Sequence, residues 1–352
     1  MSARGLVLRA GGVSRLVAPR ALATLAGLAL GLALAMLVSI ALGSTWIPPE
    51  RVLAALLGAG ETTDALIVGQ FRAPRAVQAA LAGACLGVAG FLLQRATRNP
   101  LAAPSVLGIV DGAGLGVILF LTLFSNDSNA LTVSIHWQPL AAALGGLALV
   151  ALVFALGARE LAQPVRLILY GVALAALAKA ATTTLMITGP IYRTSQALHW
   201  LAGSVHSAVW GEVALAAAIA APLALAVALL ARRLDALDLD GDSARGVGLP
   251  LLATRAGAIV LAAGLTATAI AFAGGIGFVG LVAPHLARLL TGRAAGPGLL
   301  ASALVGALMV VGADLVVRVL FAPTEVPAGA VTALVGAPYL LYLLTRRSRA
   351  DG

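Results

Sequence analysis

The sequence predicts an all-α polytopic membrane protein with about ten transmembrane helices, and two observations carry that prediction. Hydrophobic residues make up 61% of the 352-residue chain and charged residues only 11%, with a mean hydropathy of +1.02. Soluble globular proteins contain about 25% charged residues. In addition, apolar stretches of about 18 or more residues recur from one end of the chain to the other, as in proteins with many spanning helices.

Ten apolar segments are expected to form helices in the membrane, and the eighth is short and interrupted by a proline. In chain order they cover residues 22–42, 75–95, 104–123, 138–157, 166–188, 209–231, 253–273, 276–290, 299–320 and 329–345. The first contains 21 residues, whereas the apolar region of a signal peptide has about 7–15. We therefore expect an uncleaved first helix after a basic N-terminus at 1–21, one helical domain at 22–347 and a tail at 348–352.

The basic residues predict the orientation of these spans. With both termini in the cytoplasm, 17 of the 23 Lys and Arg residues fall on the cytoplasmic side. The outer side receives Arg51, Arg72, Arg75, Arg193 and Arg318. Such an excess of basic residues inside is the usual rule for membrane proteins, so an odd number of missed helices before residue 200 is not expected.

The net charge of +9 does not indicate nucleic-acid binding. No basic patch is interleaved with aromatic residues, and the arginines stand at the ends of the expected helices, where membrane proteins place them. The one cysteine, Cys85, falls inside an apolar segment, which excludes an intrachain disulfide and a cysteine metal cluster. The expected surroundings of the chain are membrane lipid and other proteins, with no nucleic acid.

No motif for catalysis is present. The one lysine, Lys179, lies within an expected span, so the chain has no Walker A loop. The sequence contains neither HExxH nor CxxC, and its four histidines are too scattered to predict a shared metal site. We expect no cofactor on this chain, and any ATP-driven step requires a separate ATPase.

A turn at residues 94–108 is broken twice by proline and carries basic residues. The residue before each proline, Asn99 or Ala103, is disfavoured in the α conformation, so the backbone there is expected to be extended or turned. Near lipid, non-helical backbone persists only where protein buries it or where it lines a water-filled cavity. The turn therefore predicts the mouth or gate of a pathway.

Three long connectors join the expected spans. Residues 43–74 and 189–208 lie on the outer side, and the second is expected to contain a short surface helix. The connector at 232–252 is cytoplasmic, polar, acidic in its centre and punctuated by glycine. It predicts a compact element on which another protein docks.

Several motifs, taken in order along the chain, are similar to those of one known family. They are Phe71-Arg-Ala-Pro-Arg75, Arg98-Asn-Pro-Leu-Ala102, Trp200-Leu-Ala-Gly-Ser204, the glycine-rich run at 274–292, Ala313-Asp314 with Arg318, Glu325-Val-Pro-Ala-Gly329 and Gly336-Ala-Pro338. The chain resembles the FecCD family over about residues 25–347. These are the membrane permeases of ABC importers for ferric siderophores, haem and vitamin B12.

The resemblance implies a permease subunit in the bacterial cytoplasmic (inner) membrane. It implies a homodimer or heterodimer of ten-helix subunits around one pathway, two cytoplasmic ATPase subunits that hold ATP and magnesium, and an extracytoplasmic substrate-binding protein. The expected cargo is an iron–siderophore complex. Cobalamin and haem remain alternatives, because in this family the choice of cargo rests largely on the binding protein.

The resemblance also implies roles for two cytoplasmic regions. Asn99, Pro100 and Leu101 match positions that narrow the cytoplasmic end of the pathway. The ATPase-coupling loop matches residues Asp240, Gly241, Asp242, Ala244, Arg245 and Gly248. The family usually has Leu-Gly-Glu in this loop, whereas this chain has Leu239-Asp-Gly-Asp242, so the acid is kept in kind within a different motif.

Arg72, Arg75 and Arg318 match positions at which the family meets glutamates of the binding protein. Complementary charge would steer the encounter and fix its register. The alternative is that Arg318 pairs with Asp314, four residues earlier on the same helix face, and that Arg72 and Arg75 anchor the chain at the membrane interface. The two roles are compatible.

Two charges lie inside expected spans, Lys179 in the fifth and Asp111 in the third. Charges within the membrane are costly and usually face a cavity or a partner. One hypothesis places Lys179 in the pathway, where it favours an anionic cargo. The other pairs Lys179 with Asp111 as a structural ion pair.

Two other classes of protein are weaker interpretations. A secondary transporter driven by protons or sodium places polar groups at mid-membrane on broken helices, and Asp111 and Asp314 could serve there. That reading leaves the docking-like loop at 232–252 without a purpose. A membrane-embedded enzyme is disfavoured because the chain offers no convergent nucleophile, base and metal set.

Overall fold

The computed structural model describes residues 6–10, 13–17, 19–43, 45–126, 128, 130–157, 164–321, 324 and 326–348. Within them, seven helices are long and apolar enough to cross a membrane. Three further apolar helices are shorter and cover Ile109–Leu123, Val279–Thr291 and Ala328–Tyr342. Glu325 of the sequence motif and the tail at 349–352 lie outside the described residues.

The helices follow one another along the chain with short connections. They are α1 (Pro19–Ala41), α2 (Pro49–Leu56), α3 (Thr62–Leu66), α4 (Ala73–Thr97), α5 (Ile109–Leu123), α6 (Gln138–Gly157), α7 (Pro164–Thr188), α8 (Ile191–Ala202), α9 (Trp210–Leu234), α10 (Gly241–Gly246), α11 (Leu251–Ala273), α12 (Val279–Thr291), α13 (Ala295–Leu320) and α14 (Ala328–Ser348). The shorter turns are the π-helix η1 (Ile67–Arg72) and the 3-10 segments η2 (Pro104–Leu107), η3 (Ile135–Trp137) and η5 (Asp235–Asp238).

Each of the ten expected spans corresponds to one helix, and most boundaries agree closely. The third is the main exception, because its helix begins at Ile109 and not at 104. Pro104 instead opens the 3-10 turn η2, and Gly108 adopts a φ of 74° before α5 begins. The expected surface helix within 189–208 is present as α8.

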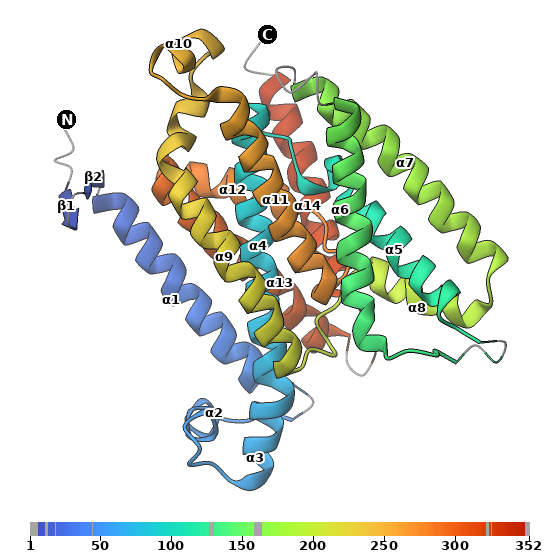
Figure 1. Ribbon diagram of the computed structural model, residues 1–352. Coiled ribbons are helices and arrows are strands. Elements are labelled where there is room, and N and C mark those ends of the chain that lie inside the picture. The colour runs from blue at the N-terminus through green and yellow to red at the C-terminus, as the bar shows by residue number, and fades with distance from the viewer. Residues whose placement is uncertain are drawn as a thin grey trace.

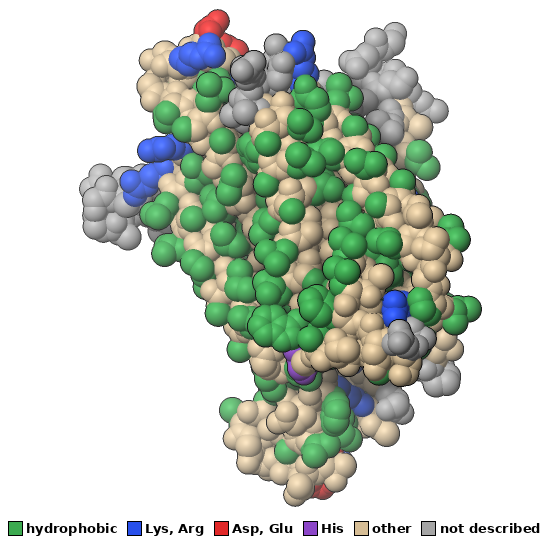
Figure 2. All heavy atoms as spheres, turned by 45° about the vertical axis from the view of Figure 1, so that its right-hand side comes forward, with side chains coloured by type: hydrophobic (Ala, Val, Ile, Leu, Met, Phe, Trp, Pro, Cys, Tyr) green, Lys and Arg blue, Asp and Glu red, His purple; other side chains and the backbone are tan. Residues whose placement is uncertain are grey.

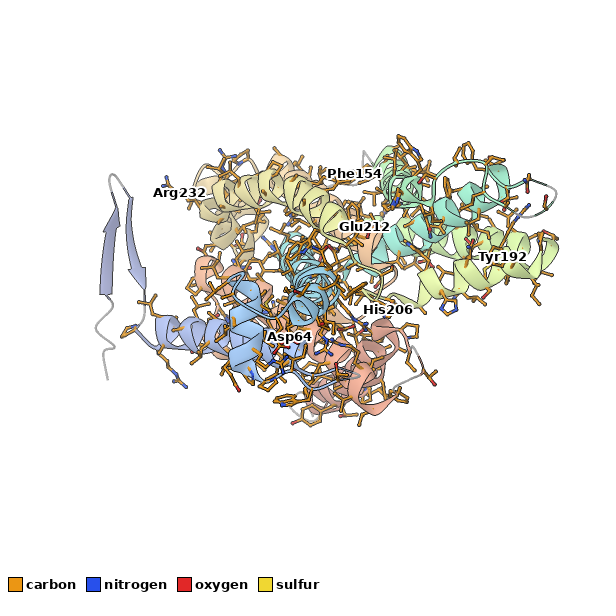
Figure 3. The ribbon with its side chains drawn as sticks, turned by 90° about the horizontal axis from the view of Figure 1, so that it is seen from below. Asp64, Phe154, Tyr192, His206, Glu212 and Arg232 are labelled. Carbon is orange, nitrogen blue, oxygen red and sulfur yellow. The ribbon has the colours of Figure 1, made fainter. Side chains whose placement is uncertain are left out.

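The structure departs from the all-α expectation at the N-terminus. There β1 (Leu6–Ala10) pairs antiparallel with β2 (Val13–Val17), with Leu6 opposite Val17. The basic segment thus contains a two-stranded hairpin, which lies beside the bundle next to the start of α1 (Figures 1 and 3). The sequence prediction missed it because each strand is only five residues long.

Helix α4 occupies the centre of the bundle and packs against α11, α12 and α13 (Figure 1). Helices α5, α6 and α7 form a neighbouring group, and α8 packs on α5. Helix α10 and the C-terminal end of α14 lie at one end, while α2 and α3 lie at the opposite end. The connectors that the sequence assigns to opposite sides of the membrane are therefore at opposite ends of the bundle.

Glycines allow α4 to approach its neighbours closely. A Cβ atom on Gly83 would overlap the carbonyl oxygen of Gly306, and one on Gly90 would overlap that of Gly280. Such contacts are typical of membrane helices. Lipid provides no hydrophobic driving force between these helices, so they associate through the close packing that small residues allow. The result is a tightly fixed unit of α4 with α12 and α13.

The surface of the bundle has the polarity expected of a membrane protein. Hydrophobic side chains spread across the middle of the face in Figure 2, and the visible acidic groups lie near its two ends. Leu30 on α1, Leu177 on α7 and Leu229 on α9 are all more than 60% exposed. With no water in the bilayer core, helices with such apolar outer faces satisfy their backbone polar groups internally.

Candidate functional site

The turn after α4 has the non-helical backbone that its prolines predict. Ala103 is extended, with φ −137° and ψ 156°. The Asn99 side chain accepts a hydrogen bond from the backbone N–H of Leu101 at 2.9 Å, which closes a tight turn around Pro100. All three residues of the expected gate, Asn99, Pro100 and Leu101, are partly buried, and the adjacent Arg98 contacts η5, which leads into α10.

Arg98, immediately before this turn, adopts a left-handed conformation with φ 51°. Its guanidinium Nε donates to the carbonyl oxygen of Leu237 in η5 at 2.9 Å. A non-glycine residue with positive φ is uncommon and costs conformational energy. The hydrogen bond to Leu237 is one gain that a glycine at this position would not provide.

The cytoplasmic connector folds into η5 followed by α10. The Asp240 carboxylate caps α10 by accepting from the backbone N–H groups of Asp242 and Ser243 at 3.2 and 2.9 Å. Gly248 ends the segment with a φ of 78°. The sequence predicts this compact element, and its N-cap has the geometry of a standard capping residue.

The two sides of α10 differ in exposure. Ala244 is fully buried against the bundle, so it anchors the helix and does not face outward. Asp242 and Arg245 form an exposed ion pair at 3.1 Å, and Val247 is 66% exposed. The outward surface of α10 is therefore a mixture of paired charge and apolar area.

A buried ion-pair cluster joins α4 to α13 at the opposite end. Asp314, 1% exposed, accepts from Arg75 Nη2 at 2.7 Å and Nε at 2.9 Å. Its second oxygen lies 3.2 Å from Arg318 Nη2. The sequence alternative that pairs Arg318 with Asp314 is thus confirmed, and Arg75 is a second partner that spacing could not predict.

His206 completes this cluster from the connector between α8 and α9. Its Nδ1 lies 2.6 Å from Arg75 Nη1. Arginine can only donate hydrogen bonds, so Nδ1 must be the accepting nitrogen in this arrangement. Seen from this end of the bundle, His206 lies between α9 and the α13–α14 side of the molecule (Figure 3).

Arg72 points inward to the end of α1, beside Ser39 and Leu42, which Arg318 contacts. It is 7% exposed, and its guanidinium donates to the carbonyl oxygens of Ile40, Ala41 and Thr45 at 2.7–2.9 Å. These carbonyls belong to the end of α1 and the chain just after it. Arg72 therefore holds the C-terminus of α1, an anchoring role that the sequence left open.

Asp111 and Lys179 line the same open cavity. The cavity has a volume of about 770 Å³, and threonines Thr182, Thr183 and Thr194 also line it. In the described part of the chain, no ion pair within 4.0 Å joins Lys179 to Asp111. The structure thus brings both charges to one cavity without direct pairing.

Two contacts lay beyond the reach of sequence reasoning. Arg95, 4% exposed, contacts Leu234 at the end of α9 and both Asp235 and Asp238 in η5. Arg51 on α2 pairs with Asp64 at 2.7 Å. The basic character of the turn was the one signal for Arg95, and no motif marked its acidic partners. Within the described residues, no group of three or more His, Cys, Asp or Glu could hold a metal.

The fold and these sites define a multi-pass α-helical membrane protein, with a cavity lined by α5, α7 and α8, a non-helical turn at one end and a short capped helix beside that turn. The chain belongs to the FecCD transport family, whose profile matches residues 21–346. It is therefore a transport subunit in the membrane without a catalytic site of its own.

Curated relatives match along nearly the whole chain. The probable siderophore transport system permease protein YfhA of Bacillus subtilis is 44% identical over 91% of this chain and 94% of its own length. The achromobactin transport system permease protein CbrC of Dickeya dadantii is 40% identical over 91% and 90%. The ferric enterobactin transport system permease protein FepG of Escherichia coli is 36% identical over 87% and 91%.

The fold also matches a solved structure. That structure is described as an inward-facing conformation of an ABC transporter of the metal-chelate type. The TM-score is 0.77 with 29% sequence identity, and the match covers 92% of this chain and 98% of the other. The agreement extends over the full bundle and not over a fragment of it.

Proposed function

We propose that this chain is the transmembrane subunit of an ATP-driven importer for ferric siderophores. The observation that carries the proposal is the full-length membership of the FecCD family, together with relatives named for siderophore, achromobactin and ferric enterobactin transport. The capped helix α10 beside the gate turn supports an ATP-driven mechanism, because it offers a docking element to a separate ATPase. The iron complex is cargo.

In this proposal ten helices of each subunit form half of a dimeric pathway. The apolar helices α5, α12 and α14 are included among the ten despite being short, since protein on their flanks can compensate for length. Two ATPases dock at the α10 end, and a binding protein delivers cargo at the end with α2 and α3. The turn at Asn99, Pro100 and Leu101 closes the cytoplasmic exit.

We assign the docking of the binding protein to the outer end of α4 and α13. The cluster of Arg75, Arg318 and Asp314 carries more positive than negative charge, which suits an acidic partner. Both arginines retain 12% side-chain exposure. Arg72 supports this surface from beneath, because its donors are engaged with the end of α1.

We place the cargo pathway along the cavity that contains Lys179 and Asp111. We favour the pathway role of Lys179 over the structural one, since a cavity-facing charge is the usual reason for keeping a lysine in the membrane. Lys179 then attracts an anionic ferric siderophore. This role distinguishes cargo by charge and not by shape.

The charge role predicts a selective loss when Lys179 is replaced by methionine. Uptake of an anionic ferric siderophore should fall by about tenfold, as expected for losing one charge-assisted contact. Uptake of a neutral ferric hydroxamate should change little. If Lys179→Met instead lowers the protein level, and Lys179→Met with Asp111→Asn restores it, the lysine is structural.

The cargo proposal is tested by uptake in cells that lack this chain, with and without the chain restored. Radiolabelled ferric siderophore, haem and cobalamin are compared under iron limitation. The proposal predicts rescue of a ferric siderophore alone, and co-purification of the chain with an ATPase. Rescue of haem or cobalamin would retain the importer and replace the cargo.

A further inference from the structure

The contacts of Arg95 and Arg98 join the gate turn to the ATPase-docking segment within one subunit. Arg98 directly precedes the turn and donates to Leu237 in η5 at 2.9 Å. Arg95, one helical turn earlier, donates to the carbonyl oxygen of Leu234 at 2.9 Å. Both acceptors belong to residues that are fully buried, Leu234 and Leu237.

Arg95 binds the same segment by charge as well. Its Nη1 lies 3.3 Å from the carboxylates of Asp235 and Asp238, and its Nη2 donates to the carbonyl oxygen of Arg293. The guanidinium also lies 4.9 Å from the ring centroid of Phe91. A planar guanidinium with several donors can hold such a divided set of acceptors, whereas lysine cannot.

The segment η5, which these arginines contact, leads directly into α10, the helix proposed to dock the ATPase. Only Leu239 and Asp240 separate η5 from α10, and Asp240 is the cap of α10. Asp235 also accepts from the backbone N–H of Ala295 at 2.7 Å, at the start of α13. These contacts form a continuous path from α10 through η5 to α4 and α13.

The inner end of α4 is held firmly enough to transmit such a movement. Gln94 donates to the carbonyl oxygen of Leu281 in α12 at 3.1 Å, and Arg288 of α12 donates to Gln94. The glycine contacts of α4 with α12 and α13 add close packing. A displacement of η5 can thus reach the turn at 99–101 through a rigid element and not through a flexible loop.

We propose that Arg95 and Arg98 are positioning residues that couple the ATPase-docking segment to the cytoplasmic gate of the same subunit. The inference rests on the proposed function, because it takes the gate and the ATPase as given. It adds the path between them. Arg98 carries the clearest sign of this role. It is an arginine in the left-handed backbone conformation, which glycine adopts at a lower energetic cost.

The test uses Arg98→Gly in the full complex with its ATPase and binding protein, reconstituted in vesicles. Glycine accepts the left-handed backbone at the end of α4, so the variant should fold with unchanged or higher thermal stability. Arg233→Ala is the matched control, because Arg233 is exposed near the end of α9 that leads into η5. The measured quantities are ATP hydrolysis and cargo transported per ATP hydrolysed.

A second readout follows the turn itself. Cys85, the one native cysteine, is replaced by alanine, and the exposed Ser105 after the gate turn is replaced by cysteine. Labelling by a thiol reagent is compared with and without ADP–vanadate, which traps the ATPase. In the wild-type background the trapped state should change the labelling rate. In Arg98→Gly the rate should no longer respond.

The expected result is ATP hydrolysis close to wild type with transport per ATP lowered by about tenfold, the effect of losing one hydrogen bond from a charged donor. Arg233→Ala should match wild type. Asp238→Ala, which removes one partly exposed partner of Arg95, should lower transport per ATP to a smaller extent.

Two results would overturn the proposal. If Arg98→Gly keeps wild-type transport per ATP and the wild-type labelling response, the coupling runs elsewhere although the importer function stands. If the wild-type chain shows neither nucleotide-dependent labelling nor ATP-driven transport, the proposed function fails and the coupling path fails with it.

Discussion

At the scale of single residues, Asp314 has the most demanding environment. It is 1% exposed, and its carboxylate pairs with both Arg75 and Arg318. A buried ion pair adds little net stability over an apolar replacement, but removal of one partner strands the other charge. The cluster therefore fixes how α4 and α13 meet more than it strengthens the fold.

The cluster predicts an unequal response to substitution of its acid and of one of its bases. Arg75→Ala should destabilise the purified protein by about 1–3 kcal/mol, because Asp314 keeps Arg318 as a partner. Asp314→Ala should cost more, about 3–5 kcal/mol, because it leaves both arginines without their shared carboxylate. Thermal unfolding in detergent measures both, and an Asp314→Ala variant as stable as Arg75→Ala would contradict the account.

The Asp240 cap predicts a local response to substitution and to pH. The hydrogen bond from the Ser243 side chain, followed by that from its backbone N–H, holds the pKa of the Asp240 carboxyl below its ordinary value of 3.8. Because the folded pKa is the lower one, the cap is fully present above the ordinary value and is lost as the pH falls through the folded value.

Asp240→Ala should therefore speed hydrogen exchange at the amides of Asp242 and Ser243 at neutral pH, while Asp240→Asn should not, since asparagine caps as well as aspartate. Mass spectrometry measures the hydrogen-exchange rate at these amides directly. Equal exchange in the alanine and asparagine variants would show that the cap does not hold α10.

At the scale of elements, apolar length was a sufficient guide to the ten helices but not to what joins them. A spanning helix can be recognised from the apolar residues of its own segment, so both ends of α6 at Gln138–Gly157 were predicted to the residue. The helices α2 and α3 and the π-helix η1 were missed, because they are at most eight residues long and carry no apolar signal of that length.

The close contact of α4 with α12 gives a test at this scale. Gly90→Ala should destabilise the protein by about 1–3 kcal/mol, because a Cβ there overlaps the Gly280 carbonyl oxygen. Gly312→Ala in α13 is the control, since a Cβ at Gly312 has nothing within 4 Å. That control should be neutral or stabilising by about 0.5–1 kcal/mol. Similar losses in both variants would argue against close packing at Gly90.

At the scale of the whole molecule, the two ends of α4 meet different partners. The outer end joins Asp314 of α13 through Arg75, and the inner end joins η5 through Arg95 and Arg98. A single rigid helix thus connects the surface proposed for the binding protein with the segment proposed for the ATPase.

The sequence predicted the parts of this arrangement but not their connections. The prolines around Asn99 dictate a turn by local sterics, and residues 232–252 are recognisable by their polarity. The contact between Arg95 and Asp235 spans 140 positions, and that between Arg75 and Asp314 spans 239. Contacts at such separations depend on how helices pack, which residue patterns along one chain do not specify.

The measurement that tests the central claim most directly is the accumulation of radiolabelled ferric siderophore in vesicles containing this chain with its ATPase and binding protein. The vesicles are supplied either with ATP or with an imposed proton or sodium gradient. The account predicts accumulation with ATP alone, abolished when the ATPase is left out. Accumulation driven by an ion gradient without ATP would contradict it and would identify a secondary transporter.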